Sequence, residues 1–264
     1  MLQHKLNENV LRSAMASKVA YAKTMKHALT FPVMTQLHGP LSNMNQCDLL
    51  KENHGCSWII HPSSSSAHAY AWRSGTQSTL IAFKGSSSLG DVASFLDMKQ
   101  IDYNFCEYKM RVHSGVMKMF ESIEPEMTAQ LLRDPPSAKP HFITFCGHSL
   151  GGALAIFASA YYANLTNRNA TVHCHTFGAP KIGDDIFYEW FTRAVDDHLH
   201  IANEKDIISY LPLDIMGYKS FSNNTFFITD AQYTSFNVCQ THNLDTYIDY
   251  LRKITEVAKI PPVK

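Results

Sequence analysis

The sequence predicts an α/β fold in which helices cover a mostly parallel central sheet. Three observations point to it. Strand-like apolar runs alternate with helical stretches through the second half of the chain, which is typical of a parallel sheet. The 264 residues are 45% hydrophobic and 17% charged, which excludes a disordered chain. A chain of this length can bury a large core without disulfide or metal support, and no linker or repeat divides it, so we expect one domain over 1–264.

In the first half of the chain, apolar spacing and turn residues predict the elements in order. The expected elements are a helix over 7–28, a short strand at SWIIH, strands at 67–72 and 78–84, a glycine and serine loop over 85–90, and helices at 91–98 and 112–123. A long polar stretch separates the first helix from the strands. We therefore expect 1–64 to form a helical and irregular extension that packs on the domain.

The second half shows the alternation most clearly, because prolines end the preceding helix and strands and helices then follow in turn. The expected elements are a strand at 141–146, a helix at 150–165, a strand at 171–177, a helix at 184–195, a strand at 198–202, a hairpin of 224–229 with 232–236, and a closing helix at 245–258.

Charge and cysteine content limit the function classes. Lys plus Arg and Asp plus Glu each number 23, and this balance argues against nucleic acid as a partner. The N-terminus lacks the continuous apolar run of a secretory signal or membrane span, which predicts a cytoplasmic or peripheral membrane protein. Cys146 and Cys174 lie in apolar runs and are expected to be buried thiols. Cys56 or Cys239 would be available for a disulfide only in an exported protein.

The strongest motif is FCGHSLGG, which contains G-x-S-x-G around Ser149. This pattern is typical of a serine on a sharp strand-to-helix turn, and an apolar strand and a small-residue helix flank it here. The turn leaves no room for side chains at Gly147 and Gly151. It also places Ser149 at a helix N-terminus, where the N–H of Leu150 points toward developing negative charge. We interpret Ser149 as a nucleophile.

A serine nucleophile needs a histidine base. The histidines after the elbow helix are His173, His175, His198, His200 and His242. The first four lie in predicted strands, whereas His242 lies in a loop before the closing helix, so it is the candidate base. The histidine beside the serine, His148, should point elsewhere and is interpreted as a packing residue.

The base needs an acid to orient it. Asp206 follows the strand HLHIAN by a short loop. This spacing places it at the carboxyl edge of the sheet, where the serine also emerges, and makes it the favoured candidate. Asp214 and Asp230 remain as alternatives.

Five segments together resemble the class 3 lipases over roughly residues 65–250. In chain order they are AFKGSSS, KMRVHSGVM, FCGHSLGGALA, TFGAPKIGD and IANEKDIISYLP. The resemblance implies an α/β-hydrolase fold with Ser149 as nucleophile, Asp206 as acid and His242 as base. It also implies that Ser86 and the N–H of Leu150 form the oxyanion hole. His113 would line or support the site, and a lid would begin at Ser88 and end near Ala93.

The expected function is hydrolysis of carboxylic esters of acylglycerol-type lipids through an acyl-enzyme intermediate. The expected partner is a lipid or other ester substrate, with peripheral contact to a lipid surface and without nucleic acid, metal or organic cofactor. Three alternatives stay open. Two are enzymes, a phospholipase A1 and a non-lipid carboxylesterase similar to feruloyl esterases. The third is a lipase-like interaction protein that carries out no hydrolysis.

Overall fold

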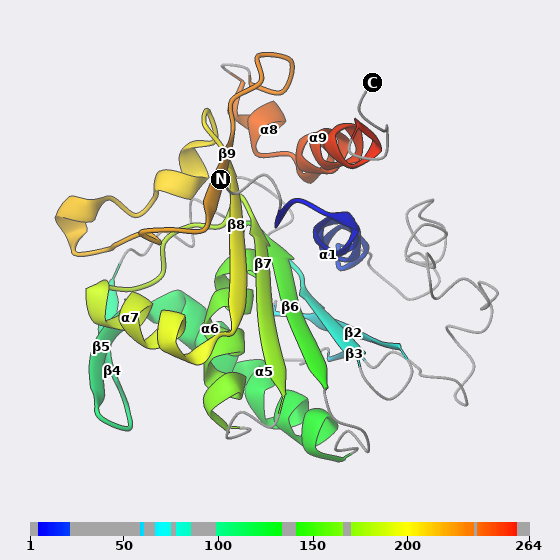
Figure 1. Ribbon diagram of the computed structural model, residues 1–264. Coiled ribbons are helices and arrows are strands. Elements are labelled where there is room, and N and C mark those ends of the chain that lie inside the picture. The colour runs from blue at the N-terminus through cyan, green and yellow to red at the C-terminus, as the bar shows by residue number, and fades with distance from the viewer. Residues whose placement is uncertain are drawn as a thin grey trace.

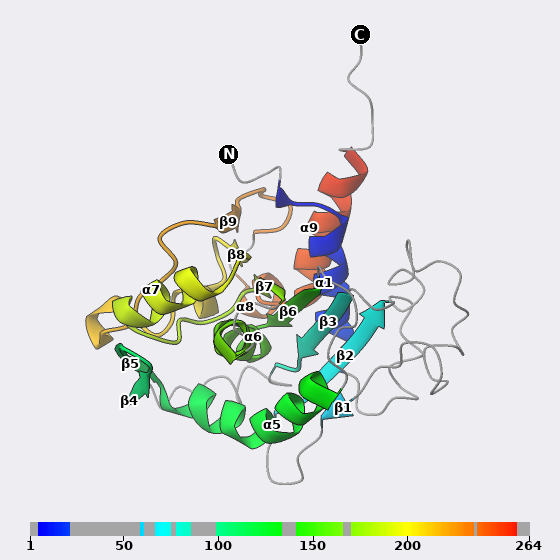
Figure 2. The ribbon, with the colours of Figure 1, turned by 60° about the horizontal axis from the view of Figure 1, so that its bottom comes forward.

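The computed structural model describes residues 5–21, 59–60, 67–74, 78–85, 99–133, 141–165, 170–234 and 237–257. Over these residues, seven strands form one sheet in the order β1-β2-β3-β6-β7-β8-β9 (Figures 1 and 2). Their bounds are β1 Ile59–Ile60, β2 Ala69–Ser74, β3 Ser78–Phe83, β6 Phe142–His148, β7 Thr171–Phe177, β8 Asp197–Asn203 and β9 Thr225–Ile228. The helices are α1 Glu8–Val19, α5 Ser114–Arg133, α6 Leu150–Leu165, α7 Asp185–Ala194, α8 Val238–Thr241 and α9 Leu244–Val257.

The sheet is mostly parallel, as predicted. Strands β3, β6, β7, β8 and β9 run parallel to one another, while β2 pairs antiparallel with β3 and β1 antiparallel with β2. The carboxyl ends of the parallel strands therefore meet at one edge. Ser149 follows β6 and Asp206 follows β8 at this edge. Topology alone thus brings the two sequence-predicted site residues to the same side of the molecule.

Helices cover both faces of the sheet (Figure 2). The helices α5, α6 and α7 lie on one face, where α6 buries nearly its whole apolar surface against the strands. The helices α1 and α9 lie on the other face, over a second apolar cluster that includes Phe177, Leu199 and Ile201. Cys146 and Cys174 are buried free thiols, as expected, and Cys239 is an exposed free thiol. In the described ranges, no helix is long and apolar enough to cross a membrane.

The predicted helix at 112–123 begins too early. Residues 100–113 form a separate hairpin of β4 Gln100–Phe105 and β5 Tyr108–His113, and α5 starts only at Ser114. The alternation of Ile101, Tyr103 and Phe105 with polar residues is the strand period. Such turns usually have glycine or asparagine at a residue of positive φ. Here Cys106 adopts the positive φ, of 51°, so the turn lacks the residue types that mark it in a sequence. The hairpin was therefore not apparent as a turn between two strands.

The predicted hairpin at 224–236 is also wrong. Strand β9 pairs in parallel with β8 at the edge of the sheet, from Thr225 beside His200 to Ile228 beside Asn203. The chain then turns, because the Asp230 carboxylate accepts the N–H of Gln232 at 3.0 Å and stabilises a compact turn. Residues 231–234 form no returning strand. Residues 235–236, the helix expected at 91–98 and most of 22–66 lie outside the described part of the chain.

Buried histidines in β7 and β8 predict a loss of stability in mild acid. Burial lowers the pKa of His175, His198 and His200 to about 4. In the unfolded chain these groups bind protons near pH 6.5. Between pH 6.5 and 4 the unfolded state therefore binds more protons, so the free energy of unfolding falls as the pH falls. Each histidine contributes roughly 1.4 kcal/mol per pH unit across that window.

Urea unfolding at pH 7, 6 and 5 measures this loss. His198 packs between the rings of Phe191 and Phe221, with centroids at 5.1 and 4.9 Å. The variant His198→Leu fills a similar volume without a titrating group, and we expect its stability to fall less steeply with acid. If the unfolding free energy of His198→Leu fell with pH as steeply as that of the wild type, the contribution assigned to His198 would be wrong.

Candidate active site

Ser149 lies on a strained turn between β6 and α6. Its φ is +56°, in the left-handed region that residues with a side chain rarely adopt. The turn is close-packed: a Cβ at Gly147 would lie 2.1 Å from the carbonyl oxygen of Gly151, and one at Gly151 would lie 2.3 Å from that of Phe83. The two glycines are therefore required where the sequence motif has them. The strain holds the serine at the carboxyl edge of the sheet.

Ser149, His242 and Asp206 form a buried chain of hydrogen bonds. The distance from Ser149 Oγ to His242 Nε2 is 2.8 Å, and the distance from His242 Nδ1 to Asp206 Oδ2 is also 2.8 Å. The residues are 1%, 6% and 0% exposed. Because an ionised carboxylate only accepts, Nδ1 carries the imidazole proton and Nε2 accepts the serine hydroxyl. This is the hydrogen-bond direction that prepares a serine for nucleophilic attack.

The Asp206 carboxylate is held by two donors besides His242. Its Oδ1 accepts the N–H of Ile208 at 3.0 Å, and its Oδ2 accepts the hydroxyl of Tyr247 at 2.6 Å. Burial, and then the nearby negative charge of Asp206, raise the pKa of Tyr247 well above its usual value, so the phenol keeps its proton. Gly178 makes room for this arrangement, because a Cβ there would lie 2.7 Å from Asp206 Oδ2.

The alternative acids and bases lie elsewhere. Asp214 forms an ion pair with Lys181, and Asp230 forms one with Lys253, both on the surface. Two other candidate bases are hydrogen-bonded within the fold: His175 Nδ1, in β7, lies 2.9 Å from Ser13 Oγ of α1, and His200 Nδ1, in β8, lies 2.5 Å from Thr176 Oγ1 of the neighbouring strand β7. His113 is buried at the end of β5, where its Nδ1 accepts the N–H of Gly115 and its ring packs on Tyr218.

Sequence reasoning missed two hydroxyls and the contacts of one histidine. His148, interpreted from the sequence as a packing residue, joins the Tyr21 hydroxyl to the main-chain carbonyl of His242. Tyr247, in α9, supports Asp206. No local motif marks either tyrosine. The position of Tyr247 on the apolar side of α9, one and a half turns after the candidate base, is the only signal in the sequence.

The predicted oxyanion hole is described only in part. Ser86 lies outside the described residues, as does the lid expected at 88–93. Leu150 begins α6, where the first N–H groups of a helix have no acceptor within it. The N–H of Leu150 is one of these groups. Gly85 follows β3 and is the last described residue before Ser86. Its backbone nitrogen lies 2.9 Å from where a Cβ of Gly151 would stand, so the end of β3 reaches the turn that carries Ser149.

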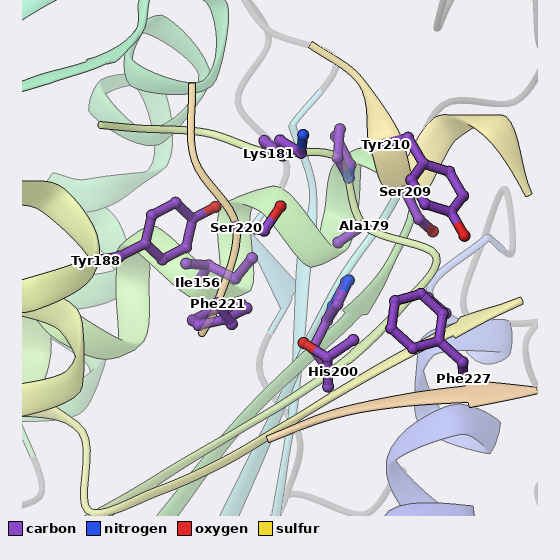
Figure 3. Close-up of a pocket in the computed structure, with 13 residues that line it drawn as sticks. Ile156, Ala179, Lys181, Tyr188, His200, Ser209, Tyr210, Ser220, Phe221 and Phe227 are labelled. Atoms are coloured by element: carbon purple, nitrogen blue, oxygen red, sulfur yellow. The ribbon is translucent and has the colours of Figure 1, made fainter. Parts of the chain in front are cut away.

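A pocket of about 120 Å³ lies beside the short helix that follows Asp206 (Figure 3), and neither Ser149 nor His242 lines it. Its walls include His200, Phe221 and Phe227, with Ser209 and Tyr210 from the short helix that follows Asp206. The described residues contain no group of three or more His, Cys, Asp or Glu side chains that could hold a metal ion.

Residues 80–216, just over half of the chain, match the sequence profile of the family described as lipase (class 3). The chain belongs to the class 3 lipase family. This match contains Ser149 and Asp206 but ends before His242.

The comparisons with individual proteins agree with this family. The lipase of Rhizomucor miehei is 26% identical over 168 residues, which are 63% of this chain and 46% of the relative. Phospholipase A1-II 1 of Oryza sativa subsp. indica is 31% identical over 116 residues, 38% of this chain and 30% of the relative. This class 3 lipase chain therefore spans less than half the length of these relatives.

The fold has solved counterparts. A triacylglycerol lipase whose catalytic centre is formed by a serine protease triad superposes with a TM-score of 0.60 at 22% identity, over 85% of this chain and 80% of the other. The class 3 lipase described here therefore has the α/β-hydrolase fold expected from its sequence.

Proposed function

We propose that this class 3 lipase hydrolyses carboxylic esters of acylglycerol-type lipids. The observation that carries the proposal is the buried chain from Ser149 through His242 to Asp206, with both hydrogen bonds at 2.8 Å. The related lipase of Rhizomucor miehei and the superposable triacylglycerol lipase support lipid esters as the substrate class.

In the proposed reaction, Ser149 Oγ attacks the acyl carbonyl while His242 Nε2 takes the hydroxyl proton. The tetrahedral oxyanion receives hydrogen bonds from the N–H of Leu150 and from Ser86. When it collapses, the C–O bond to the alcohol breaks and His242 returns the proton to that alcohol. Water then attacks the acyl-enzyme with His242 again as base, and the fatty acid leaves as Ser149 regains its proton. Asp206 stabilises the imidazolium in both halves.

Asp206→Asn should lower kcat by about 10⁴ with little change in folding. The carboxylate accepts from Ile208, Tyr247 and His242 at once, and an amide places a donor against one of them. The imidazole is then left in the tautomer with its proton on Nε2, which cannot accept from Ser149. Single-turnover kinetics on p-nitrophenyl butyrate measure the loss. Asp214→Asn, at the surface ion pair with Lys181, is the matched control and should stay near the wild-type rate.

Exposed apolar side chains next to Asp206 support contact with a lipid surface. The stretch after the catalytic acid presents Ile207, Tyr210, Leu213, Ile215 and Met216, each more than 40% exposed. Ile215 is 91% exposed. Apolar residues concentrated in one exposed segment mark a surface that binds an apolar partner. We propose that this segment, the apolar rim, rests on the lipid that supplies the substrate.

Ile215→Ser should weaken binding to phosphatidylcholine vesicles about 10- to 150-fold, because burying such a side chain contributes about 1.5–3 kcal/mol. Hydrolysis of emulsified triacylglycerol should fall in parallel, while turnover of soluble p-nitrophenyl butyrate stays unchanged. Leu165→Ser is the control, because Leu165 is 40% exposed at the far end of α6. Equal vesicle binding by the wild type and Ile215→Ser would contradict the proposal that the apolar rim contacts lipid.

The substrate class is tested by a hydrolysis panel. It contains p-nitrophenyl esters of increasing chain length, emulsified triacylglycerol and diacylglycerol, and phosphatidylcholine. We expect the acylglycerols to react fastest, and the Ser149→Ala variant to show the background rate of hydrolysis. A preference for phosphatidylcholine would instead favour a phospholipase A1, which the match to the rice enzyme supports. Activity on short soluble esters alone would favour a non-lipid esterase, and failure to react with a fluorophosphonate would favour an interaction protein.

A further inference from the structure

A chain of hydrogen bonds connects the N-terminal helix to the back of the candidate base. Tyr21, just after α1, places its Oη 2.7 Å from Nδ1 of His148. Nε2 of His148 in turn lies 2.8 Å from the main-chain carbonyl oxygen of His242. His148 is 5% exposed, and its ring centroid lies 4.7 Å from that of His242. The neighbour of the nucleophile in sequence is thus also in direct contact with the base.

The directions of these hydrogen bonds follow from the groups involved. The carbonyl of His242 only accepts, so Nε2 of His148 carries the proton. Burial, reinforced by the adjacent His242, holds the pKa of His148 well below its usual value, and the ring is neutral. Nδ1 therefore accepts from the Tyr21 hydroxyl. One tautomer satisfies both contacts, and the neutral ring sets no second positive charge beside the imidazolium that forms on His242 during the reaction.

The main chain of His242 needs such support. His242 directly follows α8, a helix of only four residues, and its own side-chain bonds change as the proton moves between Ser149 and the substrate. The bond from His148 holds an atom of His242 that takes no part in proton transfer. A displacement of the base by about 1 Å is enough to cost on the order of 100-fold in rate.

The same tyrosine contacts the strand end that leads to the oxyanion loop. A Cβ at Gly85 would lie 2.3 Å from Tyr21 Oη and 2.6 Å from the carbonyl oxygen of His148. The phenol is therefore packed between the end of β3 and the elbow. Tyr21 lies outside the segment that matches the family profile, residues 80–216.

We infer that Tyr21 and His148 are positioning residues for His242, and that the N-terminal helix is therefore part of the active site. Tyr21 fixes the His148 ring, and His148 fixes the main chain of the base. This inference rests on the proposed hydrolase function, because it assigns the two residues an effect on turnover through His242.

The test compares Tyr21→Phe with Tyr162→Phe on soluble p-nitrophenyl butyrate. Tyr162 is a fully buried tyrosine of α6, on the other face of the sheet, and its hydroxyl lies 2.6 Å from Thr128 Oγ1. Both variants lose one hydroxyl, and we expect similar changes in Tm. Tyr21→Phe should lower kcat about tenfold with KM within twofold, whereas Tyr162→Phe should keep the wild-type kcat.

His148 variants give a second readout. His148→Leu removes the donor to His242 and should lower kcat about 100-fold. His148→Gln keeps an N–H donor near the same carbonyl, and it should recover at least tenfold of that loss. A role in folding alone predicts no such recovery in kcat among folded variants. If His148→Leu fails to fold, the comparison of Tyr21→Phe with Tyr162→Phe still tests the positioning role.

Labelling by a fluorophosphonate separates this inference from the proposed function. If wild-type protein does not label, the hydrolase proposal itself fails. If wild-type protein labels, and folded Tyr21→Phe labels and turns over within twofold of the wild type, the positioning role is wrong. Slower labelling of Tyr21→Phe, with labelling of Tyr162→Phe unchanged, supports it.

Discussion

Replacing Ser149 with alanine should abolish ester hydrolysis and leave the protein folded. Loss of the nucleophile in a serine triad lowers kcat by roughly 10⁶, and only binding and oxyanion stabilisation remain. The side chain is 1% exposed, and the change removes one oxygen without altering the turn, because alanine and serine carry the same Cβ at the φ of +56°. Turnover of p-nitrophenyl butyrate and fluorophosphonate labelling both measure the loss.

A serine inside α6 provides the control. Ser159 is fully buried, and its Oγ donates to the carbonyl of Ile156 at 3.0 Å. Ser159→Ala should lose a similar small amount of stability while keeping wild-type turnover and labelling. Activity of Ser149→Ala above about a tenth of the wild-type rate would show that another group attacks the substrate.

The turn at Ser149 and the three members of the hydrogen-bonded chain could be predicted because their physical requirements are local. A serine at positive φ needs glycines two positions away on each side, and the sequence shows Gly147 and Gly151. The alternation of strands and helices then puts Asp206 at the same sheet edge. The candidate base followed by elimination, since His242 is the one histidine in a loop after Asp206. These steps used only near neighbours in sequence and the parallel topology.

The supporting contacts could not be predicted, because they depend on packing between distant segments. Tyr21 and His148 are 127 positions apart, and Tyr247 and Asp206 are 41 apart. A tyrosine on the apolar side of an amphipathic helix predicts a position in the core. Only the folded chain shows which group its hydroxyl contacts. The β4–β5 hairpin was missed for a different reason, because Cys106 takes the positive φ that the sequence pattern associates with glycine or asparagine.

His242→Ala should be as damaging as the loss of the serine, with kcat lowered by roughly 10⁶. Without the imidazole, Ser149 has no acceptor for its proton and Asp206 has no charge to stabilise. His175→Ala and His200→Ala are the matched controls: both rings are buried and hydrogen-bonded, to Ser13 and Thr176, so their loss should lower Tm and leave kcat near that of the wild type. Because the alanine leaves a space of imidazole size beside Ser149, added imidazole should restore part of the turnover of His242→Ala. It should restore none to Ser149→Ala, which lacks the nucleophile. If either control, while folded, lost turnover and His242→Ala kept it, the base would be that histidine.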